Sequence, residues 1–280
     1  MKPISLTSLV LRFKWRISFT FFLVIVESAL GILYPLFIGY AINDLLKSQY
    51  QGVINLTILG LLSLIIGTFR RVYDTRVYSR IYSQVVPEMV ESELHKESSV
   101  SKISARASLL TEFVEFLENS LPEVIGAIIS LFGIIFIIAA LNLNVFFACL
   151  GLLVLIFVIY SLTGKLNFNL NASYNGQLEL QVEAISSKDM NQIRSHFRTL
   201  MNWNIKLSDL EAGNYFLIWV GVIALLAYTP ISVISSGVLK YGLVFSILMY
   251  VFDYIDKVVT FPLYIQQLIR LREISNRLAE

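Results

Sequence analysis

Apolar residues dominate six stretches of the 280-residue chain, and polar residues gather between them. A membrane-spanning helix needs about 17–25 predominantly apolar residues, and each stretch reaches that length. The six stretches cover residues 17–46, 53–73, 124–141, 145–162, 215–233 and 241–264. The pattern therefore predicts an all-α integral membrane protein, with residues 1–280 forming a single transmembrane domain of six helices.

The connections between these predicted spans alternate between short and long. Residues 47–52, 142–144 and 234–240 form short links, whereas residues 76–123 and 163–214 are long, charged and mostly free of Pro and Gly. Long segments of that kind favour helix, so we expect both to extend spans as helices beyond the bilayer. Within the second one, the sequence KLNFNLNASYN alternates polar and apolar residues as a strand would. Its continuity with the preceding span nevertheless predicts helix.

The composition supports a membrane protein and excludes several kinds of chemistry. Hydrophobic residues make up 56% of the chain, charged residues 15%, and the mean hydropathy is +0.70. A soluble domain could not cover that much apolar surface. The single cysteine, Cys149, allows no intramolecular disulfide and no thiolate metal cluster, and His95 and His196 lie too far apart to form a metal motif. We therefore expect no cofactor, and nothing in the chain predicts a nucleic-acid partner.

The placement of positive charges predicts the orientation in the membrane. Of the 22 Lys and Arg residues, 20 lie in the N-terminal segment, along the two long connections, at the inner flank of the first connection (Arg70 and Arg71) or on the last helix, and only Lys47 and Lys240 lie in short links. Positive residues concentrate on the cytoplasmic side of membrane proteins. Both termini and both long connections are therefore expected in the cytoplasm, with the chain in the cytoplasmic (inner) membrane. The N-terminal segment is too long for a signal peptide, so we expect it to be retained.

Three segments together resemble a known family. In YPLFIGYAINDLL (Tyr34–Leu46), a Pro-x-x-x-Gly run leads to an acid, Asp44, near the outer end of the first span. SKISAR (Ser101–Arg106) resembles the start of that family's third helix, and Ser236–Glu280 resembles its sixth helix and the connector beyond it. Their order and spacing resemble the transmembrane domain of an ABC exporter over essentially the whole chain. The resemblance implies a homodimer of 12 helices, in which the fourth and fifth helices reach across to the partner subunit.

The same resemblance makes one absence informative. A P-loop needs Gly, four residues, then Gly-Lys-Ser/Thr to hold phosphates, and the nearest match, Gly164–Lys165–Leu166, lacks the first Gly and the hydroxyl. The chain is therefore not expected to be an enzyme. Both cytoplasmic hairpins also look shorter than the family pattern by roughly two helical turns, or ~10 Å, and in an exporter such hairpins hold the ATPase.

These departures favour a transporter without its own ATPase, moving a small molecule or peptide by alternating access and driven by a proton or other ion gradient. Known peptide importers of this fold that use protons offer an analogy at the level of the fold alone. Three alternatives stay open: a permease subunit served by a separate ATPase chain, a truncated chain, and a non-transporting accessory or immunity membrane protein.

Ionisable residues inside the predicted spans are the first candidates for a site, because a charge in the bilayer is costly unless it is paired or wet. Glu27 lies about ten residues into the first span, ~15 Å deep and near the midplane. Asp253 and Asp256 share a face of the last span, and Lys257 follows Asp253 at the favourable i+4 spacing. One hypothesis is that the three acids line a central cavity, where they bind a cation or exchange protons.

A simpler interpretation pairs the same charges with one another. Asp253 and Lys257 would form an internal ion pair, and Glu27 would pair with Arg70 or Arg71 across a helix interface. The aromatic residues of the last span also allow two interpretations. Tyr250 and Tyr254 could form a cavity wall for organic cations, or they could belong with the tyrosines of the membrane interface.

Two further polar sets lie outside the apolar cores of the spans. Glutamates spaced by three would form an acidic strip at the cytoplasmic end of the third helix, either a solvated face or a vestibule that attracts cationic substrates; they are Glu112, Glu115 and Glu118. Asn167 and Asn171, at i+4 spacing after the fourth span, could bind a polar substrate, neighbouring helices or water. Small residues on the first helix, from Ser28 to Gly39, predict a seam at which another helix approaches closely.

Overall fold

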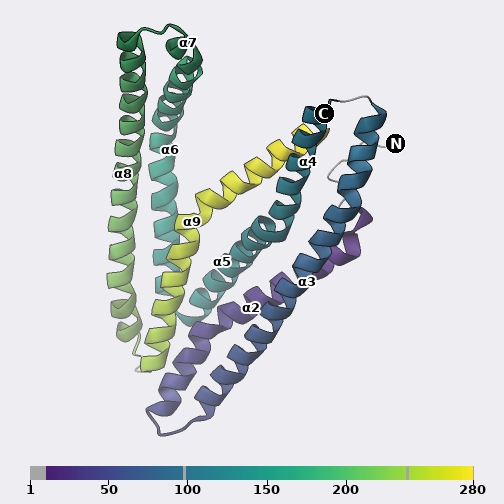
Figure 1. The fold of residues 1–280 in the computed structure, drawn as a ribbon. Helices are drawn as coiled ribbons and strands as arrows, with labels where there is room; N and C mark the ends of the chain where they lie inside the picture. The colour runs from purple at the N-terminus through teal and green to yellow at the C-terminus, as the bar shows by residue number, and fades with distance from the viewer. Residues whose placement is uncertain (1–10, 97–98, 238–239, 280) are drawn as a thin grey trace. The chain divides into compact units, whose positions relative to one another are not determined.

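The computed structural model describes residues 11–96, 99–237 and 240–279, and it is built from helices (Figure 1). The N-terminal segment as far as residue 10 and residues 97–98 of the first long connection lie outside the described residues. The helices are α2 (Lys14–Leu45), α3 (Gln51–His95), α4 (Val100–Glu115), the π-helix η1 (Phe116–Ser120), α5 (Leu121–Leu141), α6 (Leu143–Glu179), α7 (Gln181–Ser186), α8 (Met190–Ser235) and α9 (Tyr241–Ala279). The predicted all-α class is confirmed.

Five helical segments are long and apolar enough to cross a bilayer, so the chain is a multi-pass membrane protein. They are Lys14–Leu45, Gln51–His95, Val100–Leu141, Leu143–Ser186 and Met190–Ser235. Within the described residues, α9 is not among the helices that are apolar enough to cross a bilayer. Its apolar half also carries two aspartates and a lysine, which lower its hydropathy. The sixth span stays a prediction.

The long connections are helical, as predicted. Helices α3, α6 and α8 run for 45, 37 and 46 residues, about twice what a bilayer requires. The KLNFNLNASYN stretch lies inside α6 and is helix. Side chains cap some of the helices that begin at turns: Asn142 accepts a hydrogen bond from the Val145 amide, and Asp189 accepts one from the Asn191 amide. Such caps satisfy amides that have no partner within the helix.

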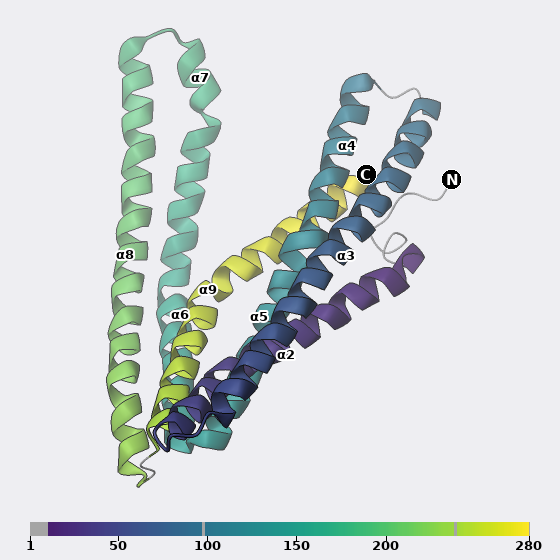
Figure 2. The same ribbon diagram turned by 60° about the horizontal axis from the view of Figure 1, so that its bottom comes forward.

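The chain folds into two compact units. Unit 1 comprises residues 1–141 and 238–280, and unit 2 comprises residues 142–237. In unit 1, α2 packs along α3 and also contacts α5 and α9 (Figures 1 and 2). Large apolar side chains of α3 and α4 fill the core at the end farthest from the α2–α3 connection, among them Tyr78, Val85, Leu110 and Phe113. The prediction of one six-helix domain is not tested by this division and stays a prediction.

Helices α2 and α9 meet at a backbone-to-backbone contact. A Cβ atom added at Gly39 or at Gly242 would overlap the carbonyl oxygen of the other glycine, so both positions need the absence of a side chain. Hydrogen bonds reinforce this crossing, and the Ser246 side chain that takes part in them is buried. The Ser246 hydroxyl donates to the Pro35 carbonyl at 2.7 Å, and the Gly242 amide donates to Asn43 Oδ1 at 2.9 Å. The predicted small-residue seam is confirmed at Gly39.

Unit 2 is a helical hairpin in which α6 packs along α8, with α7 between them in the chain. Polar pairs join the two long helices. The Asn214 amide nitrogen donates to Thr163 Oγ1 at 3.2 Å, and the side chains of Gln177 and His196 lie within hydrogen-bond distance at 2.8 Å. These contacts hold the extensions of α6 and α8 together beyond their apolar segments.

Candidate functional site

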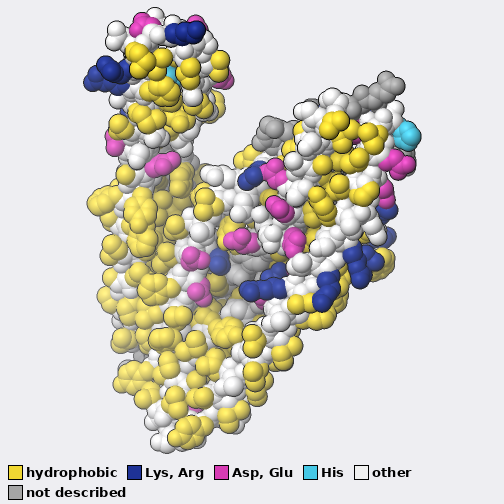
Figure 3. Space-filling view, in the orientation of Figure 1, with side chains coloured by type: hydrophobic (Ala, Val, Ile, Leu, Met, Phe, Trp, Pro, Cys, Tyr) yellow, Lys and Arg dark blue, Asp and Glu magenta, His cyan; other side chains and the backbone are white. Residues whose placement is uncertain are grey.

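Unit 1 contains an open cleft of about 530 Å³ between α2, α3, η1 and α5, which we call the polar cleft. Its volume falls within the range of ~300–1,000 Å³ that is usual for small-ligand sites. Acidic and basic side chains are mixed over these helices of unit 1, whereas apolar side chains prevail toward the α2–α3 connection (Figure 3). The charged residues that line the polar cleft are Glu27, Arg70, Arg71, Asp74, Glu118 and Glu123.

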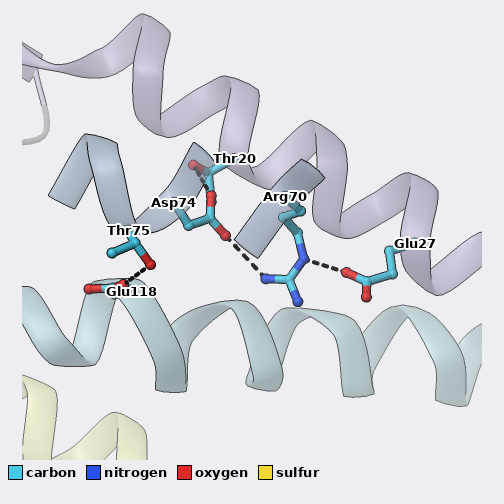
Figure 4. Close-up of polar contacts among 6 residues, drawn as sticks. All are labelled: Thr20, Glu27, Arg70, Asp74, Thr75 and Glu118. Atoms are coloured by element: carbon cyan, nitrogen blue, oxygen red, sulfur yellow. Dashed lines mark hydrogen bonds and ion pairs between the residues drawn. The ribbon is translucent and has the colours of Figure 1, made fainter. Parts of the chain in front are cut away.

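One arginine bridges two carboxylates at the edge of this cleft (Figure 4). Arg70 of α3 donates through Nε to Glu27 Oε2 of α2, and through Nη1 to Asp74 Oδ2, one turn along its own helix, at 3.2 Å. The Thr20 hydroxyl of α2 donates to the other carboxylate oxygen of Asp74 at 2.8 Å. These four residues form what we call the Arg70 network. The structure therefore shows the pairing of Glu27 with Arg70 that the simpler interpretation described.

A glycine makes room for this network. Gly67 lies three residues before Arg70 on α3, and a Cβ atom there would stand 2.9 Å from Glu27 Oε1. Any larger residue would push the carboxylate away from the helix that carries its arginine. Because Gly67 has no side chain, the Glu27 carboxylate can lie against α3 beside Arg70.

The charges of the Arg70 network do not cancel. Two carboxylates share one guanidinium group, which leaves a formal excess of one negative charge. The two acids differ in access, because the Glu27 side chain is 31% exposed and the Asp74 side chain only 4%. Uncompensated charge in a poorly solvated place is costly. Of the two carboxylates, Glu27 is the more accessible to a cation in the cleft.

The π-helix η1 supplies one wall of the cleft. Its Glu118 accepts a hydrogen bond from the Thr75 hydroxyl of α3 at 3.0 Å, and Asn119 lines the cleft beside it. Single π-turns inside longer helices frequently occur at functional sites. This turn also changes how the glutamates of the expected acidic strip are oriented.

The three glutamates of the predicted strip do not share a face. Glu112 accepts a hydrogen bond from Arg270 Nε of α9 at 2.7 Å, whereas Glu118 faces α3 and Glu115 is exposed between them. A π-turn holds more residues than an α-turn, so it changes the direction of every side chain that follows it. The strip was predicted from α-helical spacing alone, and here that spacing is interrupted.

The cleft lies far from the α2–α3 connection. Glu27 is 18 residues before the end of α2, and Arg70 is 19 residues after the start of α3. At 1.5 Å per residue these are ~27 and ~29 Å along the helices, close to the ~30 Å thickness of the hydrocarbon core. The position of Glu27 near the midplane of the membrane stays a prediction.

The acids of α9 do not line the polar cleft. Lys257 Nζ bonds Asp256 Oδ2 at 3.1 Å rather than the expected Asp253, and the Asp256 side chain is 64% exposed. Asp253 is half-buried, and within the described ranges it makes no hydrogen bond or ion pair. The structure therefore does not bring these aspartates together with Glu27 in one cavity.

The remaining candidates also lie outside the cleft, except for Arg71. Tyr250 and Tyr254 are completely buried, and the Tyr250 hydroxyl donates to the Ile32 carbonyl of α2 at 2.7 Å. They pack inside unit 1 and leave no open wall for a ligand. On α6, the Asn171 amide nitrogen donates to Asn167 Oδ1 at 2.7 Å, so these two side chains are bonded to each other.

Several residues of the site were not expected from the sequence. Asp74 had a signal, because it follows Arg70 at the i+4 spacing of helical ion pairs. Thr20, Thr75 and Asn119 had none, since hydroxyl and amide side chains occur throughout the chain. Within the described part of the chain, no group of three or more His, Cys, Asp or Glu side chains could hold a metal ion.

These helices form a multi-pass membrane domain, and several are about twice as long as a bilayer requires. The sequence profile of the family described as ABC transporter transmembrane region matches residues 6–252. The chain belongs to this family, as the resemblance of its first, third and sixth spans predicted. The match is to a transmembrane region, and no nucleotide-binding domain is matched. A comparison with curated proteins finds no match.

Proposed function

We propose that the chain is a transporter that uses a proton or another cation, taken up at the polar cleft, to drive a solute across the cytoplasmic membrane. The observation that carries this proposal is the excess negative charge of the Arg70 network beside an open cleft. Glu27 contacts that cleft and also holds α2 to α3 through Arg70. A change in its charge therefore acts on a contact between two helices.

The coupling follows from what protonation does to this contact. A proton on Glu27 removes its ion pair with Arg70, whereas the ion pair between Arg70 and Asp74 stays. The contact between α2 and α3 is therefore weaker at that point. A ligand shifts a conformational equilibrium only when it binds one state better than the other, and a proton meets that condition here. The other charged groups that face this position are Arg71 on α3, Glu118 on η1 and Glu123 on α5.

The membrane arrangement belongs to the same proposal. Family membership supports a homodimer of this chain, surrounded by lipids, that moves a small molecule or peptide by alternating access. The concentration of Lys and Arg in the long connections supports cytoplasmic positions for both termini. In this proposal the ion gradient supplies the energy for movement, and no nucleotide is needed.

The test is transport by purified protein in vesicles that contain no nucleotide. A defined mixture of short peptides, amino acids and organic amines is offered with and without an imposed pH gradient, and mass spectrometry measures what accumulates. We expect gradient-dependent accumulation by the wild type and its loss in Glu27→Gln. The matched control is Glu183→Gln, at an exposed position of unit 2, which should behave as the wild type.

Three results would overturn the proposal. Equal accumulation by Glu27→Gln removes the role of this carboxylate. Accumulation that needs ATP and an added ATPase chain, and ignores the gradient, identifies a permease subunit. No accumulation under either condition, together with a protein partner that co-purifies with the chain, identifies a binding scaffold.

A further inference from the structure

Two charged side chains of the polar cleft have no partner among the described residues. Arg71 of α3 and Glu123 of α5 are exposed and line the cleft, and neither makes a hydrogen bond or an ion pair there. The other charged residues of the lining are engaged: Glu27, Arg70 and Asp74 with one another, and Glu118 with the Thr75 hydroxyl. The cleft thus offers one free guanidinium group and one free carboxylate from different helices.

This pair of free groups selects for a particular ligand chemistry. A guanidinium group binds a carboxylate through two parallel hydrogen bonds, and a carboxylate accepts hydrogen bonds from an ammonium group. A solute with only a positive charge leaves Arg71 unpaired, and a solute with only a negative charge leaves Glu123 unpaired. A solute with both groups pairs both residues.

We propose that the polar cleft binds a zwitterionic solute, with its carboxylate on Arg71 and its ammonium group on Glu123. The inference rests on the proposed function in one respect: it assumes that the bound solute is also the solute that is transported. Apolar side chains also line the cleft, including Val24 and Pro122, and they suit the uncharged part of such a molecule. Asn119 and Ser28 offer neutral hydrogen-bonding groups to its interior.

The remaining charge of the cleft predicts an order of affinity among zwitterionic solutes. Glu118 receives a hydrogen bond from a neutral hydroxyl, so its negative charge is not compensated. An additional ammonium group on the solute would meet this charge, and an additional carboxylate would be repelled by it. Binding should therefore weaken in the order Ala-Lys-Ala, Ala-Ala-Ala, Ala-Glu-Ala.

The test measures binding by calorimetry to the detergent-purified full chain, where no gradient exists. The probes are trialanine with free ends, N-acetyl-trialanine, which lacks the ammonium group, and trialanine amide, which lacks the carboxylate. We expect the wild type to bind trialanine at least ten-fold more tightly than either blocked form. Arg71→Gln should weaken the binding of trialanine about ten-fold and leave the binding of trialanine amide unchanged. Glu123→Gln should also weaken the binding of trialanine about ten-fold, but leave the binding of N-acetyl-trialanine unchanged.

Matched controls separate this recognition from a loss of folding. Arg76→Gln removes an exposed arginine farther along α3 whose side chain, among the described residues, bonds only the Val72 carbonyl. Glu183→Gln removes a distant carboxylate. Both should bind all three probes as the wild type does. Each variant is included only if its thermal unfolding midpoint matches that of the wild type, and Arg71→Lys and Glu123→Asp replace any variant that fails.

The outcomes distinguish this inference from the proposed function. Equal affinity for the three probes, no binding of trialanine at millimolar concentration, or equal weakening of all probes by Arg71→Gln would overturn the zwitterion site. Selective binding without gradient-driven accumulation overturns the proposed function and leaves the site. Gradient-driven accumulation of organic amines alone overturns the site and leaves the proposed function.

Discussion

Helix α2 contacts its neighbours differently at two places along its length. Around Gly39 it crosses α9 with backbone against backbone, and the hydrogen bonds there join neutral groups. Around Glu27 it faces α3 through an ion pair that borders an open cleft. The first contact depends on the absence of side chains, and the second depends on the charge of two of them.

The difference separates what fixes the fold from what can respond to the surroundings. A contact between glycine backbones does not change with pH or salt, because none of its atoms carries a net charge. A contact between carboxylates and a guanidinium group changes with both. One helix is thus anchored at one place and sensitive at the other, and mutations can test each property separately.

Arg70→Gln should have the largest effect on stability. It leaves Glu27 and the buried Asp74 without their shared positive charge, and breaking a buried ion pair costs about 3–5 kcal/mol. Because the cleft admits water, we expect the lower end, about 3 kcal/mol, measured by chemical unfolding in detergent. The exposed Arg76→Gln is the control and should cost less than about 0.5 kcal/mol. If Arg70→Gln has the same denaturant midpoint of unfolding as the wild type, the stabilising role given to this network is wrong.

Gly242→Ala should have the next largest effect. The added methyl group overlaps the Gly39 carbonyl oxygen, so α2 and α9 must move apart, and such overpacking costs about 1–3 kcal/mol. Gly31→Ala is the control, because a Cβ atom at Gly31 meets open space and alanine favours helix by up to ~1 kcal/mol. The cost of Gly242→Ala should be the same at low and high salt. A strong salt dependence would mean that charge also holds this crossing.

Glu88→Gln should have the smallest effect. Arg12 donates to both carboxylate oxygens of Glu88, at 2.6 and 2.9 Å, and this hydrogen bonding lowers the pKa of Glu88 in the folded protein. A lowered pKa stabilises the fold above the unfolded-state pKa, and the stabilisation is lost as the pH falls through the folded-state value. Because both side chains are about half exposed, we expect ~0.2–1 kcal/mol at pH 7.

The measurement for Glu88 is the difference in unfolding free energy between wild type and Glu88→Gln as a function of pH. This difference should be largest near neutrality and shrink once the pH falls below about 4. A difference that stays constant down to acidic pH would show that the variant acts through packing instead of charge.

The sequence was sufficient for the helices and for part of the site. Apolar stretches of membrane length and long connections without Gly or Pro predicted helices such as α6, including its KLNFNLNASYN segment. The possible pairing of Glu27 with Arg70 followed from the cost of isolated charge. The hydrogen bond from Thr20 to Asp74 did not, because it depends on how α2 and α3 lie against each other.

Two features could not be predicted from residue spacing. The π-turn at η1 separates Glu112 from Glu118, and spacing arguments assume an uninterrupted α-helix. The complete burial of Tyr250 depends on how closely α9 approaches α2, which two glycines far apart in the sequence decide together. Pairwise fits of this kind belong to the folded chain and leave little trace in either helix alone.

The crossing of α2 and α9 has a consequence for how the protein is made. Its hydrogen bonds join residues 199, 211 and 218 positions apart. A ribosome finishes α2 early and reaches α9 only after the whole of unit 2, so the glycine surface of α2 enters the membrane before its partner exists. During that interval other helices have access to it. Completion of unit 1 is therefore delayed until α9 has been synthesised.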